Sequence, residues 1–394
     1  MAGALEGIRV IDFGRFIAAP YCAMLFADMG ADVIRVERRE GGEDRYVGPV
    51  TDSGEGGLFL NLNRNKRGIT LDPATPAGQE ITRRLIESAD IVIVNLPIDV
   101  MKKLRLDYDS LCVIKPDIIL VMASAFGPDG PYAKRVGFDT VAQAMSGAVG
   151  LTGFPGAPVR AMVSYADYGT ALHAAFGAMI ALYERQKAGR GQVIDVSLLA
   201  TGVTFMMPLL AERAVTGIKR EQQGNTAYHA APSDIYPVKD GWILVQTIGN
   251  PMFRRWALMV GREDLLDDPR CKDDISRGNN YKIINEVMLA WCATRTRDEA
   301  IVELEKARLP CGPVYNLDEV LQDPQVNARH IIETLDYPGC SKPVPVASTP
   351  MRLSATPGEL RHRAPTLSEH TSEVLLELGF SENEIAAFRK AEAI

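Results

Sequence analysis

The chain has 394 residues, of which 46% are hydrophobic and 24% charged, a composition typical of a soluble globular protein long enough for two domains. Its 43 Lys and Arg against 50 Asp and Glu give a net charge of −7, so no overall positive field favours nucleic acid. Six scattered cysteines without a CxxC pair indicate neither a disulfide framework nor a zinc site, and no long apolar run predicts a membrane span, so we expect a cytoplasmic protein.

The first third of the chain predicts a parallel α/β sheet. Short β-branched or apolar runs alternate with helical patterns, with strands expected at 8–12, 32–37, within 61–72, at 91–94 and at 118–123, and helices at 18–29, 75–89 and 104–114. This alternation is typical of a Rossmann-like fold. The turn over Phe13–Pro20 lacks the three glycines of a dinucleotide-binding fingerprint, although the acidic Glu37 ends the second strand, so we do not expect NAD binding.

Basic side chains recur where these strands are expected to end. They are Arg15, Arg38 with Arg39, Lys66 with Arg67, and Lys102 with Lys103 beyond Asn95. Open α/β sheets bind ligands at the carboxyl ends of their strands, so these clusters indicate a phosphorylated ligand. Charges that only solvate loops are the alternative.

Two aspartates stand in apolar, glycine-punctuated sequence between residues 137 and 182. Asp139 fits either an acceptor for backbone N–H groups or a residue that orients Asp167. Asp167 precedes a helix expected over Tyr168–Arg185, so it fits either an N-cap or a nucleophile. Small residues recur along that helix and predict close packing against a neighbour. His173 in the same helix is more typical of a core residue than of a base, and the five histidines show no metal-ligand spacing.

The second half of the chain changes character. A strand is expected at 192–198 and an apolar helix at 199–215, kinked at Pro208, before a polar, basic linker at 216–226. Two strands joined at Asp240-Gly241 predict a β-hairpin over Ser233–Gln246. Helical patterns at 252–260, 281–293 and 297–307 complete a small α+β domain, and a proline-rich connection at 338–350 leads to amphipathic helices at the carboxyl end.

Several of these segments carry motifs at family-like spacing over essentially the whole chain. They are Gly7–Asp12, Ala19-Pro20, Ala27–Glu37, Asn63–Arg67, Gly137–Asp139, Ser164–Asp167, Gly189–Gln192, Arg363–Pro365 and Glu369–Thr371. Together they resemble the class III CoA-transferases, the family of formyl-CoA transferase and carnitine CoA-transferase.

The resemblance implies a large Rossmann-like domain built from residues 1–215 and 331–394, with a linker at 216–226 and an inserted small domain at 227–330. It also implies an interlocked homodimer. Coenzyme A or acyl-CoA would be bound as substrate, with no permanent cofactor and no metal. The groove residues that match the family are Arg15, Phe16, Ile17, Ala18, Arg38, Leu71, Asn95, Leu96 and Lys103. Asp167 matches the catalytic aspartate, which forms first a mixed anhydride and then an aspartyl-CoA thioester.

Two departures bear on the substrate. The segment Gln222–Thr226 has one glycine where formyl-CoA transferases carry a glycine-rich loop, and Ile17 stands where they have glutamine. An oxalate substrate is therefore not expected, and succinyl-CoA with a small dicarboxylate acceptor is the preferred pair.

A related isomerase, α-methylacyl-CoA racemase, needs two bases and has histidine at the position of Phe138. Phenylalanine cannot exchange a proton, so one of the two bases is missing here. A non-catalytic CoA-binding protein is the remaining alternative.

Overall fold

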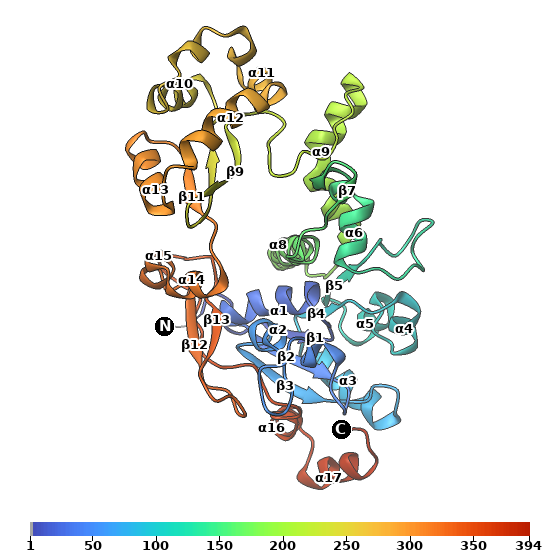
Figure 1. The fold of residues 1–394 in the computed structure, drawn as a ribbon. Helices are drawn as coiled ribbons and strands as arrows, with labels where there is room; N and C mark the ends of the chain where they lie inside the picture. The colour runs from blue at the N-terminus through green and yellow to red at the C-terminus, as the bar shows by residue number, and fades with distance from the viewer. Residues whose placement is uncertain (1–2) are drawn as a thin grey trace. The chain divides into compact units, whose positions relative to one another are not determined.

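The structure is a computed structural model and describes residues 3–394 (Figure 1). The chain divides into two compact units. Unit 1 comprises the residues up to Ser146, Ala161–Ala211 and Pro324–Ile394, and unit 2 comprises Gly147–Arg160 and Glu212–Asp323. Relative to the expected boundaries, residues 147–160 lie in unit 2 and residues 324–330 lie in unit 1.

Unit 1 is built on a six-stranded parallel sheet, which confirms the predicted α/β class. The spatial order is β3-β2-β1-β4-β5-β8. The bounds are β1 (Arg9–Asp12), β2 (Asp32–Glu37), β3 (Lys66–Thr70), β4 (Ile91–Val94), β5 (Ile119–Ser124) and β8 (Val193–Ser197). The order reverses between β1 and β4, which opens a crevice at the carboxyl ends of these strands, where ligands of such folds bind.

Helices cover both faces of this sheet (Figure 1). One face packs against α1 (Ala18–Asp28) and α8 (Tyr165–Ala188). The other packs against α3 (Pro76–Ser88), α5 (Tyr108–Ile114), α16 (Thr371–Glu377) and α17 (Glu382–Lys390). The small residues of α8 that meet α1 and the sheet, such as Ala174 and Ala178, are fully buried, as the sequence predicted.

Two local expectations differ from the structure. The single helix expected at 104–114 is wrong: α4 (Ile98–Lys103) ends before it, and α5 begins at Tyr108. Arg105 between them has a φ of 57°, a left-handed conformation that no helix continues through. The segment before β3 forms two helices that the sequence pattern did not indicate, η1 (Glu43–Tyr46) and α2 (Gly57–Leu62).

The helix after β8, α9 (Leu198–Thr216), is long and apolar enough to cross a membrane by length and composition alone, with a mean hydropathy of 1.3 in its most apolar window. The sequence analysis found no uninterrupted apolar run there, because Thr201, Thr204 and Glu212 break it. A single helix of this kind also occurs in the cores and interfaces of soluble proteins.

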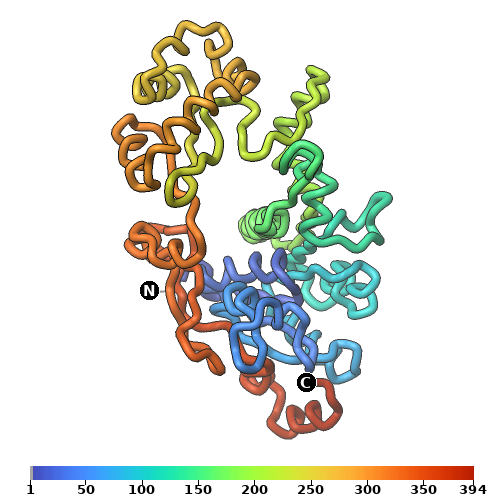
Figure 2. The backbone as a smooth tube through the Cα atoms, viewed as in Figure 1, coloured from blue at the N-terminus to red at the C-terminus, as the bar shows by residue number. Residues whose placement is uncertain are grey.

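The carboxyl-terminal segment returns to the first part of the chain. Figure 2 shows the red carboxyl-terminal part of the tube running next to the blue amino-terminal part. Backbone hydrogen bonds join the two: Asn65 donates to His362 at 2.9 Å, His370 to Gly68 at 2.9 Å, and Asp72 to Ala393 at 2.8 Å. These contacts make both ends of the chain parts of unit 1. The antiparallel pair β12 (Ile332–Leu335) and β13 (Val344–Ala347) precedes this segment.

Unit 2 contains the predicted hairpin. Strands β9 (Ser233–Val238) and β10 (Gly241–Gln246) pair antiparallel, and β11 (Cys311–Pro313) adds to β10. The longer helices beside this sheet are α10 (Asn250–Met259), α12 (Tyr281–Cys292) and α13 (Arg297–Lys306). Its core centres on Trp256 and Tyr236, both buried.

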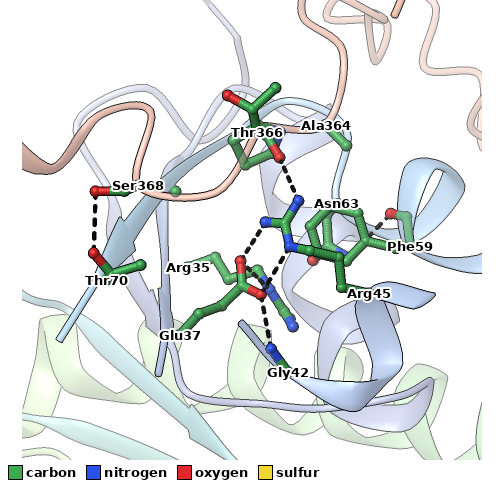
Figure 3. Close-up of polar contacts among 12 residues, drawn as sticks. Arg35, Glu37, Gly42, Arg45, Phe59, Asn63, Thr70, Ala364, Thr366 and Ser368 are labelled. Carbon is green, nitrogen blue, oxygen red and sulfur yellow. Dashed lines mark hydrogen bonds and ion pairs between the residues drawn. The ribbon is translucent and has the colours of Figure 1, made fainter. Parts of the chain in front are cut away.

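A buried ion-pair network holds η1 onto the sheet (Figure 3). Arg45 donates to Glu37 at 2.6 Å, lies over the ring of Phe59 and also donates to the carbonyl of Pro365 at 3.1 Å. Arg35 on β2 pairs with Asp44 of η1 at 2.6 Å. Removing one partner of such a buried pair leaves an uncompensated charge, so the network fixes η1 firmly.

Candidate active site

A cavity of about 400 Å³ opens at the carboxyl ends of β1, β4 and β5, within unit 1. Its size is in the range of small-molecule sites in proteins. Its wall comes from the end of β5, from three loops that follow those strands and from the first turns of α1, α4, α8 and α9. The residues are Arg15, Phe16, Ala18, Asn95, Leu96, Pro97, Ile98, Asp99, Met122–Pro128, Ala133–Phe138, Asp167 and Leu198.

Asp167 is the third residue of α8 and lines this cavity. The helix begins at Tyr165, so the interpretation of Asp167 as an N-cap is wrong: Ser164 occupies that position, and its side chain caps nothing. The Asp167 carboxylate has no hydrogen-bond or ion-pair partner among residues 3–394. A carboxylate that is partly buried without a partner is costly for folding and therefore points to a role toward a ligand.

Burial and, as the smaller cause, the nearby negative charge of Asp139 together raise the pKa of Asp167 to about 7. Both causes disfavour the ionised form. Near neutral pH the group is therefore a basic and poorly solvated carboxylate, which is a stronger nucleophile than an exposed one.

This shift predicts a pH dependence. If the carboxylate is the reactive form, kcat/KM should rise with pH through a midpoint near 7, since that parameter reports the free enzyme. Because the folded-state pKa lies above its ordinary value of 3.8, the contribution of Asp167 to stability is full below 3.8 and is lost as pH rises toward 7. Initial rates across this range check the first expectation. A flat profile between pH 5 and 8 would contradict it.

Asp139 holds the start of α8. It is the first residue of α6 (Asp139–Met145) and is only 4% exposed. One carboxylate oxygen accepts the backbone N–H of Ala166 at 2.8 Å and of Asp167 at 3.2 Å, and the other accepts the amide of Gln143 at 2.5 Å. Asp139 thus supplies the cap that Ser164 does not, and it fixes the backbone of Asp167 directly. The role as an acceptor for backbone N–H groups is therefore confirmed, and a role in orienting the Asp167 carboxylate stays a prediction.

The turn after β1 is fixed by Asn95. The Arg15 N–H donates to the Asn95 side-chain oxygen at 2.9 Å, and the Asn95 amide donates back to the Arg15 carbonyl at 2.7 Å. The next residue, Phe16, has a φ of 61°, which is unusual for a residue other than glycine. Such strain persists only where surrounding contacts impose it, and it is concentrated at functional sites.

We expect Asn95→Asp to loosen this turn. Aspartate keeps the acceptor for the Arg15 N–H but cannot donate to the Arg15 carbonyl, so one bond of about 1 kcal/mol is lost and a repulsion is added. KM for the acyl-CoA should rise about tenfold while kcat changes less, because the turn binds substrate without reacting. Steady-state kinetics check this, and an unchanged KM would mean that the turn does not meet the substrate.

Arg38 and Arg15 are brought together by Glu43 of η1. Arg15 lies 3.2 Å and Arg38 2.6 Å from the two oxygens of this glutamate. Arg38 itself does not line the cavity, but its guanidinium is about half exposed and stays accessible. The two arginines therefore meet at the sheet edge with one net positive charge, because Glu43 offsets the other, and their role in binding phosphate stays a prediction.

Three other groove residues lie away from the cavity wall. Leu71 is 1% exposed and its side chain belongs to the core beneath the sheet, so its place in the CoA groove stays a prediction. Ile17 stands at the start of α1 and packs against a small core cluster. Lys103 ends α4 with an exposed side chain. The remaining predicted residues line the same cavity as Asp167 and Phe138; they are Arg15, Phe16, Ala18, Asn95 and Leu96.

The prediction that Lys66 and Arg67 lie at the ligand edge is wrong. They begin β3, so they are at its amino end. Lys66 is buried and pairs with Asp12 at 2.8 Å, and burial lowers its pKa to about 8. Arg67 pairs with Asp32 at 2.8 Å and with two glutamates of α16. Both are structural in this fold.

The sequence did not reveal that the loop after β5 forms part of the cavity wall. Phe126 and the segment Ala133–Gly137 line it, including the cations Lys134 and Arg135. The guanidinium of Arg135 lies 4.6 Å from the ring centre of Tyr132 and 5.5 Å from that of Phe126. A signal was present, since a turn-rich segment with two cations follows a buried strand at the edge where ligands bind.

Phe138 is 57% exposed and packs edge-on against Phe16, with ring centres 5.5 Å apart. The pair gives the cavity an aromatic side close to the turn of β1.

His173 lies further along α8, where its Nδ1 is 3.2 Å from the hydroxyl of Thr201. Within residues 3–394 no three His, Cys, Asp or Glu side chains are grouped to hold a metal ion.

Comparison with known proteins identifies close relatives. The succinyl-CoA–D-citramalate CoA-transferase of Chloroflexus aurantiacus is 34% identical over 99% of this chain and 98% of its own length. The succinate–glutarate CoA-transferase of Agrobacterium fabrum is 33% identical over 95% of each chain. The succinyl-CoA:mesaconate CoA-transferase of Haloarcula hispanica is 32% identical, covering 96% of this chain and 97% of its own.

A solved structure has the same fold. A CAIB/BAIF family protein from Brucella suis superposes with a TM-score of 0.85 at 32% identity, covering 96% of this chain and all of that one. The family model described as CoA-transferase family III matches residues 5–371. These findings confirm the resemblance seen in the sequence motifs: the chain belongs to CoA-transferase family III and is a CoA-transferase.

Proposed function

We propose that this enzyme transfers CoA from succinyl-CoA to a small carboxylic acid, with Asp167 as the covalent nucleophile. The observation that carries the proposal is the Asp167 carboxylate, which lines a cavity without a partner and whose pKa is raised to about 7. Three relatives named for succinyl-CoA or succinate support the donor.

The reaction proceeds through two kinds of aspartyl intermediate. The Asp167 carboxylate attacks the thioester carbonyl, which forms a mixed anhydride and releases CoA thiolate. The thiolate then attacks the aspartyl carbonyl of the anhydride, which forms an aspartyl-CoA thioester and frees succinate. An incoming carboxylate attacks this thioester, and the same two steps in reverse yield the new acyl-CoA and free Asp167. Holding thioester and carboxylate together makes each attack effectively unimolecular.

Cations around the cavity supply the contacts for CoA. Arg15, Lys134 and Arg135 line it, and Arg38 joins Arg15 through Glu43. Guanidinium groups bind phosphate oxygens in pairs, so these residues are suited to the phosphates of CoA. Asn95 spends both of its polar atoms on the Arg15 backbone, so we assign it to holding the turn rather than to contacting the ligand.

Phe138 argues against racemase chemistry. A racemase of this fold needs a proton-exchanging base at that position, and a phenyl ring offers none. The exposed Phe138 ring instead provides an apolar surface beside Phe16 for the acyl chain of the thioester.

We infer a homodimer from an uncovered apolar face on α8. Phe176, Ile180 and Tyr183 on this helix are 69%, 50% and 63% exposed. Apolar patches of this kind mark protein interfaces, and a second copy of the chain is the partner that the family resemblance implies. Sedimentation at micromolar concentration should give about twice the chain mass of 43.0 kDa.

A reducing cytoplasm fits the six cysteines, all of which are free thiols.

The proposed function is tested by offering one CoA donor, succinyl-CoA, to several carboxylic acids. The full-length protein is incubated with succinyl-CoA and, in separate reactions, with citramalate, glutarate, mesaconate or malate, and the new CoA thioesters are separated by chromatography. We expect transfer to at least one of these acids with release of an equal amount of succinate. Binding of CoA without any transfer would instead identify a non-catalytic CoA-binding protein.

A further inference from the structure

A second cavity, of about 470 Å³, lies in unit 1 and shares no lining residue with the cavity of Asp167. Its wall comes from α1, α2 and the fourth residue of α8, and from the segments that follow α15 (Pro324–Ala328) and β13. Tyr168 contributes to this wall from the position next to Asp167. None of the steps proposed for CoA transfer uses this cavity.

The charge of this second cavity is positive. Three arginines line it, and no lining residue is acidic. Arg64 is neutralised by Asp28, whose carboxylate lies 2.7 Å from it. Arg329 and Arg352 are exposed, and neither guanidinium has a hydrogen-bond or ion-pair partner in the described part of the chain, residues 3–394. The wall therefore carries two uncompensated positive charges, which attract an anion.

Neutral hydroxyl groups complete the wall. Tyr21 and Tyr168 pack edge-on with ring centres 4.9 Å apart, and burial raises the pKa of both, so their hydroxyls remain donors. Thr349 is only 9% exposed, yet its hydroxyl has no hydrogen-bond partner within residues 3–394. A buried hydroxyl without a partner is costly, and the oxygen of a ligand would satisfy it.

We propose that this second cavity binds a small dicarboxylate. Arg329 and Arg352 stand on separate segments, so each guanidinium can take one carboxylate in forked geometry, while the hydroxyls of Tyr21 and Thr349 donate to the remaining oxygens. Inorganic phosphate carries a similar charge on a single centre, so it is the comparison ligand that tests whether two separate carboxylates are needed. The inference does not rest on the proposed CoA transfer, because it concerns other residues and a ligand that binds without reacting.

Isothermal titration calorimetry on the full-length protein, without CoA, tests the proposal. Sodium succinate is the probe, and sodium phosphate is the comparison. The wild type should bind succinate at a site that the double variant Arg329→Gln and Arg352→Gln weakens by about tenfold or more, because charge-assisted bonds are lost. Arg254→Gln is the matched control, since Arg254 is an exposed arginine on α10 that lines neither cavity. Its binding should equal that of the wild type.

Thr349→Val separates binding from folding. Valine removes a hydroxyl that has no partner in the ligand-free protein, so the melting temperature should stay equal or rise while succinate binding weakens. Three outcomes would overturn the proposal: no heat of binding with wild type, unchanged binding by the double variant, or phosphate binding more tightly than succinate. A change from dimer to monomer in the double variant, without a change in succinate binding, would assign these arginines to contact between subunits instead.

Discussion

Asp167→Asn should lower kcat for CoA transfer by about four orders of magnitude or more, because the amide cannot form the anhydride and loss of a covalent nucleophile removes the reaction path. The affinity for CoA should be retained, since the cations that line the cavity are untouched. Asp99→Asn is the matched control: Asp99 is an exposed carboxylate on the same cavity wall and should keep most of the activity. Equal loss in both variants would contradict the assignment.

The same substitution should raise stability above pH 7. In the native protein Asp167 is ionised there against burial and against the charge of Asp139, and the amide removes that penalty. The rise from 3.8 to about 7 corresponds to about 4 kcal/mol at about 1.4 kcal/mol per pKa unit, and solvent access to this half-buried carboxylate reduces the expected gain in unfolding free energy to on the order of 2 kcal/mol. Denaturant unfolding at pH 8 measures it. A less stable Asp167→Asn protein would mean that the residue is structural, whatever its activity.

Asp139→Ala should destabilise the fold by about 3 kcal/mol, because it leaves the N–H groups of Ala166 and Asp167 without their acceptor and removes one of the two acceptors of the Gln143 amide, which keeps the carbonyl of Val163. This is the largest stability effect that we expect from one side chain at the site. Thermal unfolding measures it, and Asp99→Ala provides the control for an exposed carboxylate nearby.

The milder change Asp139→Asn keeps an acceptor oxygen and removes the charge. The pKa of Asp167 should then fall by up to about one unit, because burial, the larger cause of the shift, remains. The midpoint of the kcat/KM profile should move to lower pH by the same amount. A profile that stays in place would show that the charge of Asp139 does not reach Asp167.

The sequence predicted the parts of the fold that depend on local pattern. The run Ile91–Val94 is apolar throughout because both faces of a central parallel strand are covered, and it matches β4. The hairpin around Asp240-Gly241 follows from the φ that a tight turn demands. The pattern around Asp167 predicted a helix there, although its start was placed three residues too late.

The sequence did not predict the features that depend on contacts between residues far apart in the chain. Lys66 begins β3 because of its pairing with Val33, and no local pattern reveals at which end of a short strand a cation lies. Leu71 is drawn into the core under α3 and α16 by contacts distant in the chain. Asp139 caps a helix that begins 26 residues later, a link that only the packed structure provides.

The most direct test of the account is to trap the aspartyl-CoA thioester. The full-length protein is incubated with succinyl-CoA alone, treated with hydroxylamine in one sample and borohydride in another, digested, and analysed by peptide mass spectrometry. We expect a single modified position, Asp167, which depends on the donor and is absent in the Asp167→Asn variant. An active enzyme that yields no adduct, or one that carries the adduct on another carboxylate, would contradict the central claim.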